Sequence, residues 1–337
     1  MQRVTKVPCG WMRRARYGGS QLEGGHVTSS RPVRDIAADA FNACLTSGVR
    51  RCELDRGGRK LRWLEAGAGN PPVVFESGAA SNSVTWAAVF AALAPDHRVI
   101  AYDRAGYGAS DSGPLRVDGQ LADLIALLEA MTPDPAILVG HSWGGLLAQL
   151  VAWSRPELIA GLLLLDPSHE RFWSELAEPT DLRAIGEHPD LAQPARTDPR
   201  SAELFSYADQ LSHEVAASVS DDPRIRDVVR QASRSYLATD EQLRVHLDEV
   251  PMIVDRLEDL TYRRSTATWP EVPTIILTAT KGRPERFVAP VVAIQEQVAR
   301  AANAQHIVVS DSGHYIHVDR PDLVTRLVRD IAARLAG

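Results

Sequence analysis

The stretch Ile137–Gly145 reads ILVGHSWGG, and the helical pattern of Leu146–Val151 follows it. A short apolar strand therefore breaks at a Gly-x-Ser-x-Gly turn and continues as an apolar helix. A serine at so sharp a turn must take a strained backbone, and glycines on either side relieve the crowding. The turn lifts the Ser142 hydroxyl clear of the sheet, and the helix N-terminus stabilises developing negative charge. We predict that Ser142 is a catalytic nucleophile; the alternative is a glycine-rich turn whose serine only caps the helix.

A nucleophilic serine needs a base, and His314 is the best placed of the ten histidines. It follows the apolar run His306–Val309 and the turn Ser310–Gly313, and a helical pattern comes shortly after it. A histidine on a loop after the last strand can lie over the serine, which proton abstraction requires. We therefore predict that His314 is the general base.

Two other histidines lie close to these positions in the sequence. His317 is the alternative base, but its apolar neighbours indicate a packed side chain. His141 precedes the serine and is expected to be a structural part of the turn.

The third member of such a site is a carboxylate that orients the histidine. The apolar run Gly161–Leu165 ends in Asp166, at the carboxyl edge where α/β sheets place catalytic groups. We predict that Asp166 accepts a hydrogen bond from one imidazole nitrogen, which fixes the tautomer and stabilises the imidazolium. If Asp166 only forms a turn, the acid is Glu285, Glu170 or Asp311, with Glu285 as the first alternative.

These motifs, in this order, resemble the α/β-hydrolase superfamily of the serine esterase type, over roughly residues 50–335 apart from a middle insertion. Many members carry an aspartate after the strand expected at Pro273–Thr278, but this chain has no carboxylate there before Glu285. Some lipases, haloalkane dehalogenases and lactone hydrolases hold their acid where Asp166 stands. Haloalkane dehalogenases and epoxide hydrolases share the layout but use an aspartate nucleophile, and Ser142 argues against both.

The resemblance also implies an oxyanion hole of two backbone N–H groups. One comes from the residue after the nucleophile, here Trp143. The other comes from the loop Glu76–Asn82, where Gly78 and Ala79 are the expected donors and Ala80 is the alternative. A further loop, Ala101–Asp111, is interpreted as a strand end with a glycine-rich turn, because its glycine spacing does not fit a dinucleotide fingerprint.

The rest of the chain fits an α/β-hydrolase fold with an eight-stranded, mostly parallel sheet, flanking helices and an inserted helical cap. Alternating strand and helix patterns predict that sheet, and a hairpin through Gly57-Gly58 opens it. The expected strands are Arg51–Asp55, Leu61–Ala66, Val73–Phe75, Val99–Tyr102, Ala136–Val139, Leu162–Leu165, Thr274–Leu277 and Ile307–Ser310. The expected helices include Val84–Leu93, Gln120–Met131, Leu146–Ser154 and Val288–Ala301.

We divide the chain into a core, residues 31–168 and 270–337, and a helical cap, residues 169–269. The cap shows helical periodicity without a convincing strand, and a lid of this kind excludes water and shapes the substrate pocket. Candidates for its inner lining are Phe172, Trp173, Leu204, Phe205, Tyr207 and Leu211. Residues 1–30 form a tail without apolar periodicity. Because Leu22–Val27 can be encoded as a ribosome-binding site followed by GTG, one hypothesis is that the natural protein begins at Val27; the alternative is a basic tail for a partner or a membrane surface.

Composition excludes several classes of function. The net charge of −6 gives no reason to expect nucleic acid or anionic membranes as partners, and no segment reaches the length of a membrane span. Three cysteines, Cys9, Cys44 and Cys52, suit a reducing cytoplasm, and no Cys/His spacing resembles a zinc site. The arginine-rich, lysine-poor composition indicates a GC-rich bacterial genome. We expect no cofactor, and a homodimer is compatible with the sequence.

The sequence predicts a serine hydrolase that cleaves a carboxylic ester through an acyl-enzyme. Lactone hydrolases acting on macrolactones such as zearalenone resemble this layout, so the expected substrate is a hydrophobic ester or lactone. The alternatives with the same triad are a proline-type aminopeptidase, a carbon–carbon bond hydrolase or a cofactor-free haloperoxidase. A receptor-like member that binds ligand with hardly any turnover is the alternative without enzymatic activity.

Overall fold

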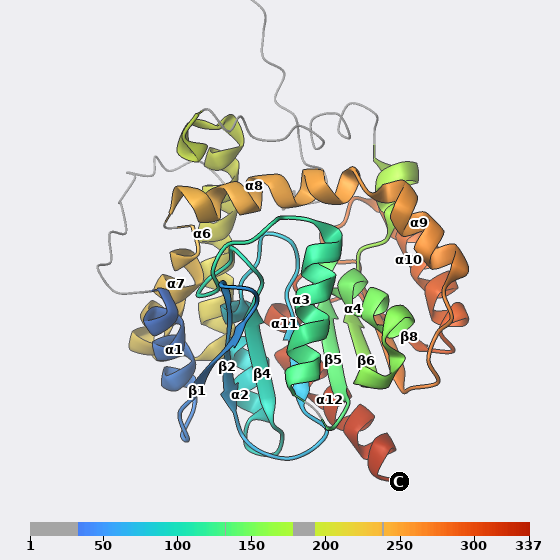
Figure 1. Ribbon diagram of the computed structural model, residues 1–337, viewed down its shortest axis with the longest axis horizontal. Helices are drawn as coiled ribbons and strands as arrows, with labels where there is room; N and C mark the ends of the chain where they lie inside the picture. The colour runs from blue at the N-terminus through green and yellow to red at the C-terminus, as the bar shows by residue number, and fades with distance from the viewer. Residues whose placement is uncertain (1–32, 132, 178–192, 238) are drawn as a thin grey trace, which may run out of the picture.

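The computed structural model describes residues 33–131, 133–177, 193–237 and 239–337 (Figure 1). The expectations for the tail of residues 1–30 and for the start at Val27 lie outside these residues. Eight strands form one sheet in the order β1-β2-β4-β3-β5-β6-β7-β8. They are β1 (Arg50–Asp55), β2 (Lys60–Ala66), β3 (Val73–Glu76), β4 (Val99–Asp103), β5 (Ala136–His141), β6 (Ile159–Leu165), β7 (Thr274–Ala279) and β8 (Gln305–Val309).

The predicted fold class is confirmed, because all eight strands form and the sheet is mostly parallel. Only β2 runs against its neighbours, pairing antiparallel with β1 in the expected hairpin and with β4 on its other side. The helices of the core are α1 (Val33–Cys44), α2 (Ala87–Leu93), α3 (Val117–Ala130), α4 (Trp143–Ser154), α10 (Glu285–Ala301), α11 (Ile316–Asp319) and α12 (Pro321–Ala336). None of the helices that the structure describes combines the length and apolar character needed to cross a bilayer.

The sheet is buried on both faces, which explains why its central strands read as continuous apolar runs. In β6, Leu163 and Leu165 enter one apolar cluster with α1, α2 and α12, while Leu162 and Leu164 enter the other with α3, α4 and α10. Alternation of side chains along a strand produces this division. The central parallel strands therefore hold their carboxyl ends in one rigid row.

Helix α1 was not among the predicted helices. Its buried residues are mostly alanines, together with Phe41, whose ring meets that of Phe90 on α2 at 4.7 Å between centroids. Apolar residues recur at helical spacing from Val33 to Cys44, so the sequence does carry the signal of this helix, and the aromatic contact anchors it.

Between β6 and β7, the described residues form helices joined by short irregular connections, and none of them forms a strand. The long helices are α6 (Pro199–Val219), α7 (Pro223–Ser235), α8 (Asp240–Val254) and α9 (Leu257–Thr266), which we call the cap. Helix α8 crosses above the sheet in Figure 1, and Gln242 of α8 donates a hydrogen bond to the carbonyl of Gly108 at 3.1 Å. Leu204 and Phe205 pack within the cap, whereas Tyr207 and Leu211 pack on the core.

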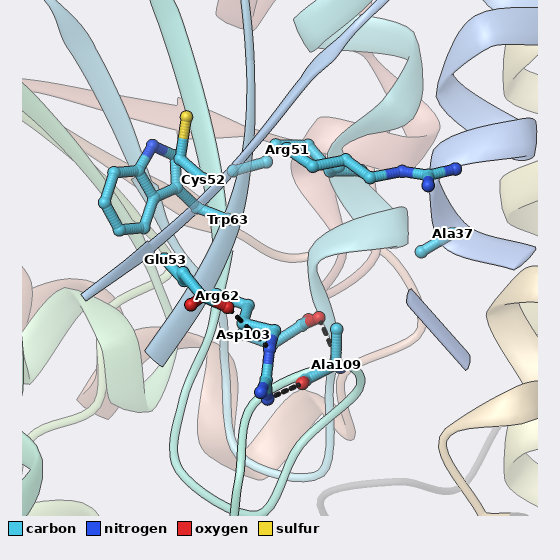
Figure 2. Close-up of a pocket in the computed structure, with 10 residues that line it drawn as sticks. Ala37, Arg51, Cys52, Glu53, Arg62, Trp63, Asp103 and Ala109 are labelled. Atoms are coloured by element: carbon cyan, nitrogen blue, oxygen red, sulfur yellow. Dashed lines mark hydrogen bonds and ion pairs between the residues drawn. The ribbon is translucent and has the colours of Figure 1, made fainter. Parts of the chain in front are cut away.

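A surface cavity of about 240 Å³ lies between the β1–β2 hairpin, β4 and α1 (Figure 2). Arg51, Cys52 and Asp103 are among its lining residues, and none of the predicted site residues lines it. The Asp103 carboxylate already accepts hydrogen bonds from the N–H groups of Ser83 at 2.9 Å and Ala109 at 3.0 Å. The Asp103 carboxylate therefore stabilises the local fold.

Four histidines of the described chain are buried, namely His141, His169, His246 and His317. His317 is fully buried and stacks on Trp86 with 4.0 Å between ring centroids. Burial, together with the nearby His314, lowers the pKa of His317 to about 3. A histidine in an unfolded chain has a pKa of about 6.5. At mildly acidic pH, His317 is therefore protonated in the unfolded state but stays neutral in the folded state.

We expect acidification to destabilise the protein through these histidines. The contribution of these histidines to stability is fully present above pH 6.5 and is lost as the pH falls toward 3. His317 alone should lower the free energy of unfolding by about 2 kcal/mol between pH 7 and pH 5. We would measure the free energy of unfolding in urea at pH 7 and at pH 5. The decrease between these pH values should be smaller in His317→Phe than in the wild type by that amount. His213→Phe, at an exposed cap position, is the control. An unchanged pH dependence in His317→Phe would contradict the assignment.

Candidate active site

The turn between β5 and α4 holds Ser142 in a strained backbone conformation, with φ 53° and ψ −118°. Three hydrogen bonds fix it. The Ser142 N–H donates to Leu165 at 3.0 Å, and its carbonyl accepts from Leu146 at 3.2 Å and from Ser168 at 2.8 Å. The last two bonds tie the turn to helix α4 and to the segment after β6. The side chain of Ser142 is partly exposed.

The glycines of the turn are required by close backbone approach. A Cβ on Gly144 would lie 2.4 Å from the carbonyl oxygens of both Glu76 and Ser77. A Cβ on Gly140 would lie 2.6 Å from the carbonyl oxygen of Gly144. The helix and the loop after β3 can therefore meet only if Gly144 carries no side chain, and the strand can turn into the helix only if Gly140 carries none.

The structure brings His314 and Asp166 together. Nδ1 of His314 lies 2.6 Å from Oδ2 of Asp166. Asp166 is buried at the end of β6 with φ 42°, and its N–H donates to Leu277 at 2.7 Å. Because a carboxylate accepts, the proton is on Nδ1, which leaves the lone pair of His314 on Nε2. A histidine in this tautomer can accept a proton at Nε2.

The loop after β7 surrounds Asp166 with donors. Arg283 donates to Oδ2 at 2.7 Å, and the N–H of Ala279 donates to Oδ1 at 3.2 Å. Burial alone would raise the pKa of Asp166, but the Arg283 guanidinium and the His314 hydrogen bond outweigh it and hold this pKa below its ordinary value. Asp166 is therefore ionised. Sequence reasoning noted only that this loop lacks a carboxylate and did not identify Arg283.

The alternative acids are occupied elsewhere or exposed. Glu170 accepts two hydrogen bonds from Arg264, at 2.7 and 3.0 Å. Asp311 pairs with Arg320, and Glu285 is exposed at the start of α10. In the part of the chain that the structure describes, His314 makes no hydrogen bond to any of these three carboxylates.

The two other histidines near the serine have structural contacts. His317 lies in the core on Trp86, as described above. Nε2 of His141 lies 2.9 Å from the carbonyl oxygen of His314, so its N–H donates there and holds the His314 loop. Burial lowers the pKa of His141 well below its ordinary value, with a further contribution from the neighbouring His314.

The Ser142 hydroxyl lies 3.5 Å from the hydroxyl of Ser168. Within the part of the chain that the structure describes, Ser142 and His314 form no side-chain hydrogen bond. Such bonds are often long in ligand-free enzymes and shorten when substrate binds. Ser168 was not predicted, and its position after Asp166-Pro167 places it beside Ser142.

The loop after β3 lies against Ser142. A Cβ on Gly78 would lie 3.1 Å from Cβ of Ser142. The N–H of Ala80 is already donated to Glu249 at 3.1 Å and to Tyr107 at 3.2 Å, whereas Ala79 is partly exposed. Of the two alternatives, Ala79 is therefore the residue whose N–H is available.

Trp143 is the first residue of α4. The first intrahelical bond of this helix is donated by Leu146 to Ser142, so the N–H of Trp143 has no intrahelical acceptor. The Trp143 ring is fully buried. Its N–H can therefore serve a ligand at Ser142 without loss of a helical bond.

A buried charge network lies under this loop. Arg104 donates to Glu76 at 2.8 Å, to Glu249 at 3.0 Å and to the carbonyl of Gly78 at 2.8 Å. All three charged side chains are nearly or fully buried. Sequence reasoning interpreted the Arg104 loop as structural and did not identify Glu249, whose only local signal is a carboxylate on an otherwise buried helix face.

Among the described residues, no group of three or more His, Cys, Asp and Glu side chains is arranged to hold a metal ion. The chemistry available at this edge of the sheet is that of a hydroxyl, an imidazole, a carboxylate and backbone N–H groups.

Known proteins resemble this chain in sequence over short segments. It is 38% identical over 121 residues to an epoxide hydrolase of Caballeronia sordidicola, a match covering 34% of this chain and 36% of that protein. It is 36% identical over 109 residues to a pimeloyl-[acyl-carrier protein] methyl ester esterase of Pectobacterium carotovorum, covering 32% of this chain and 41% of that protein. The chain thus spans less than half the length of these curated relatives.

Solved structures resemble the chain over most of its length and share its fold. Cfl2 of Burkholderia cenocepacia superposes with a TM-score of 0.66 at 22% identity, covering 84% of this chain and 95% of that one. An alpha/beta hydrolase fold protein of Burkholderia ambifaria gives a TM-score of 0.64 at 22% identity, covering 83% and 97%. The model of the alpha/beta hydrolase family matches residues 73–327, well over half of the sequence, and the chain therefore belongs to the α/β-hydrolase family.

Proposed function

We propose that the protein is a serine hydrolase that cleaves a carboxylic ester bond through an acyl-enzyme. The observation that carries the proposal is the 2.6 Å contact between Nδ1 of His314 and the buried carboxylate of Asp166. This contact leaves Nε2 of His314 as a base at the sheet edge that also presents the strained Ser142. A hydroxyl, a base and an orienting acid are the three parts that acyl transfer needs.

In the first half-reaction, Oγ of Ser142 attacks the ester carbonyl while Nε2 of His314 takes its proton. The imidazolium that forms is stabilised by the ionised Asp166. The negative charge on the carbonyl oxygen is stabilised by the N–H groups of Trp143 and of the Gly78–Ala79 loop. His314 then gives its proton to the departing alkoxide, which leaves as the alcohol.

In the second half-reaction, water replaces the alcohol. His314 takes a proton from the water, the hydroxide attacks the acyl-enzyme, and Ser142 regains its proton when the acid leaves. The cap over the strand ends excludes bulk water from these steps.

We infer that the substrate is a hydrophobic ester or lactone. Two observations support this substrate class: the ring of Tyr315 lies 5.6 Å from that of His314, and the ring of Tyr207 lies 6.2 Å from that of Tyr315. These rings give the surroundings of the base an apolar character, which suits an apolar acyl or alcohol group. The relative named as a methyl ester esterase also favours an ester. A macrolactone such as zearalenone belongs to the same substrate class.

We expect Ser142→Ala to abolish hydrolysis, because the variant lacks the hydroxyl that the Asp166–His314 pair is proposed to activate. Acid release followed by pH-stat across linear esters, lactones, aminoacyl amides and vinylogous diketones would measure it, with wild type beside the variant. Loss of turnover on esters or lactones only in the variant supports the proposal. Turnover of amides or diketones alone would favour the peptidase or the carbon–carbon hydrolase. Saturable ligand binding without turnover would favour the receptor-like alternative.

We expect Asp166→Asn to lower kcat by on the order of 10⁴, because an amide neither fixes the Nδ1–H tautomer nor stabilises the imidazolium. Glu285→Gln is the matched control, since it neutralises the exposed alternative acid after β7, and its kcat should stay at the wild-type value. Steady-state kinetics on the best ester of the panel would measure both. The assignment fails if Glu285→Gln loses activity and Asp166→Asn retains it.

A further inference from the structure

Glu249 belongs to the cap helix α8, yet its carboxylate is fully buried among groups of the core. Its Oε1 accepts from Arg104 at 3.0 Å and from Gln120 at 2.6 Å. Its Oε2 accepts from the N–H of Ala80 at 3.1 Å and from the hydroxyl of Tyr107. One cap carboxylate thus joins four core residues that come from three different segments.

On one side this carboxylate fixes the loop after β3. Ala80 has φ 53°, a conformation that a residue with a Cβ keeps only when its surroundings enforce it. The hydrogen bond from its N–H to Glu249 is part of that enforcement. Arg104, held by Glu249, donates to the carbonyls of Ser77 and Gly78. The peptide that carries the Ala79 N–H and the peptides on either side of it are therefore all tied to this ion pair.

On the other side the carboxylate reaches the turn of the nucleophile. Nε2 of Gln120 donates to Glu249, and Oε1 of the same amide accepts the indole N–H of Trp143 at 2.7 Å. The amide of Gln120 relays the position of Glu249 to Trp143. Both residues that are proposed to donate to the oxyanion are thus connected to Glu249.

The docking of α8 explains how the carboxylate reaches this place. Gln242, Val245, His246 and Glu249 follow one another at helical spacing, so they share one face of α8. A Cβ on Gly106 would lie 2.6 Å from the side chain of Val245, and the ring of His246 lies 4.3 Å from that of Tyr107. This face packs on the loop that carries Arg104.

We propose that Glu249 is a positioning residue for the oxyanion hole, so that docking of the cap helix α8 sets the place of both N–H donors. The proposal rests on the proposed function. It makes α8 a fixed part of the catalytic site, and substrate reaches Ser142 without displacement of this helix. Catalysis is sensitive to such positioning, because an error of about 1 Å can cost on the order of a hundredfold in rate.

The test is Glu249→Gln, which keeps the volume of the side chain but removes its charge and one of its two acceptor atoms. The second-order rate constant for labelling of Ser142 by an alkyl fluorophosphonate would be measured per titrated active site. We expect it to fall roughly tenfold to a hundredfold. For the best ester of the panel, kcat should fall in the same proportion while KM stays within about threefold, because the substrate carbonyl in the ground state carries little charge.

Glu65→Gln is the matched control. Glu65 is also a buried carboxylate paired with arginines, Arg50 and Arg98, but it lies on β2 and does not contact the oxyanion loop. Its labelling rate should match that of wild type even if its melting temperature falls. A merely structural role of Glu249 would lower the number of active sites and leave the rate per site unchanged, which would overturn the proposal.

If Glu249→Gln does not fold, Glu249→Asp provides the same test. It keeps the charge for Arg104 but is one methylene too short to hold Ala80 as well, so a reduced rate per site is again expected. A wild-type rate in either folded variant overturns the inference. If the wild type is not labelled, or if Ser142→Ala is labelled equally, the proposed function itself fails.

Discussion

The backbone of Ser142 imposes the constraint from which the rest of the site follows. Its conformation, φ 53° and ψ −118°, is stable only because the N–H is bonded to the end of β6 and the carbonyl to both α4 and the segment after β6. The bond from the Ser142 N–H to the Leu165 carbonyl also fixes the place of Asp166, which is the next residue along the chain. The absence of a side chain at Gly144 lets the loop after β3 come into contact with the same turn, and its absence at Gly140 lets the turn itself close. One strained residue thus brings three segments together.

The electrostatics of the site follow from the row of parallel strand ends. The end of β6 supplies Asp166, the loop after β7 supplies Arg283 and the Ala279 N–H, and the loop after β8 supplies His314. Both Arg283 and His314 donate to the same oxygen of Asp166. Arg283 therefore keeps the carboxylate ionised, and it also offsets part of the attraction that an imidazolium would feel. The orienting effect of Asp166 on the tautomer is unaffected by this offset, since it depends on the hydrogen bond.

The sequence predicted features whose causes are local. The eight strands were recognisable because both faces of the sheet are buried, and the Ser142 turn was recognisable because its glycines are needed within four residues of the serine. Asp166 and His314 were located by their places after apolar strands, and the structure brings them into contact. The Arg104–Glu249 pair could not be predicted, because its partners are 145 residues apart and meet only when α8 docks. Helix α1 was missed although its apolar residues recur at helical spacing, since it precedes the alternating strand and helix patterns by which the fold was recognised.

The buried network around Arg104 is hard to explain by stability alone. Moving charges out of water costs several kcal/mol for each ion, and apolar side chains of similar volume often stabilise such a place as well or better. Here one guanidinium serves two buried carboxylates, and burial raises the pKa of Glu76 despite the opposing effect of Arg104. What apolar residues could not supply is a set of donors and acceptors directed at the backbone of Ser77–Ala80. The network donates to the carbonyls of Ser77 and Gly78 and accepts from the N–H of Ala80. These bonds determine where the neighbouring N–H of Ala79 points. A helix that carries one of these ions cannot swing away as a simple lid, because its departure would leave Arg104 and the loop without their partner.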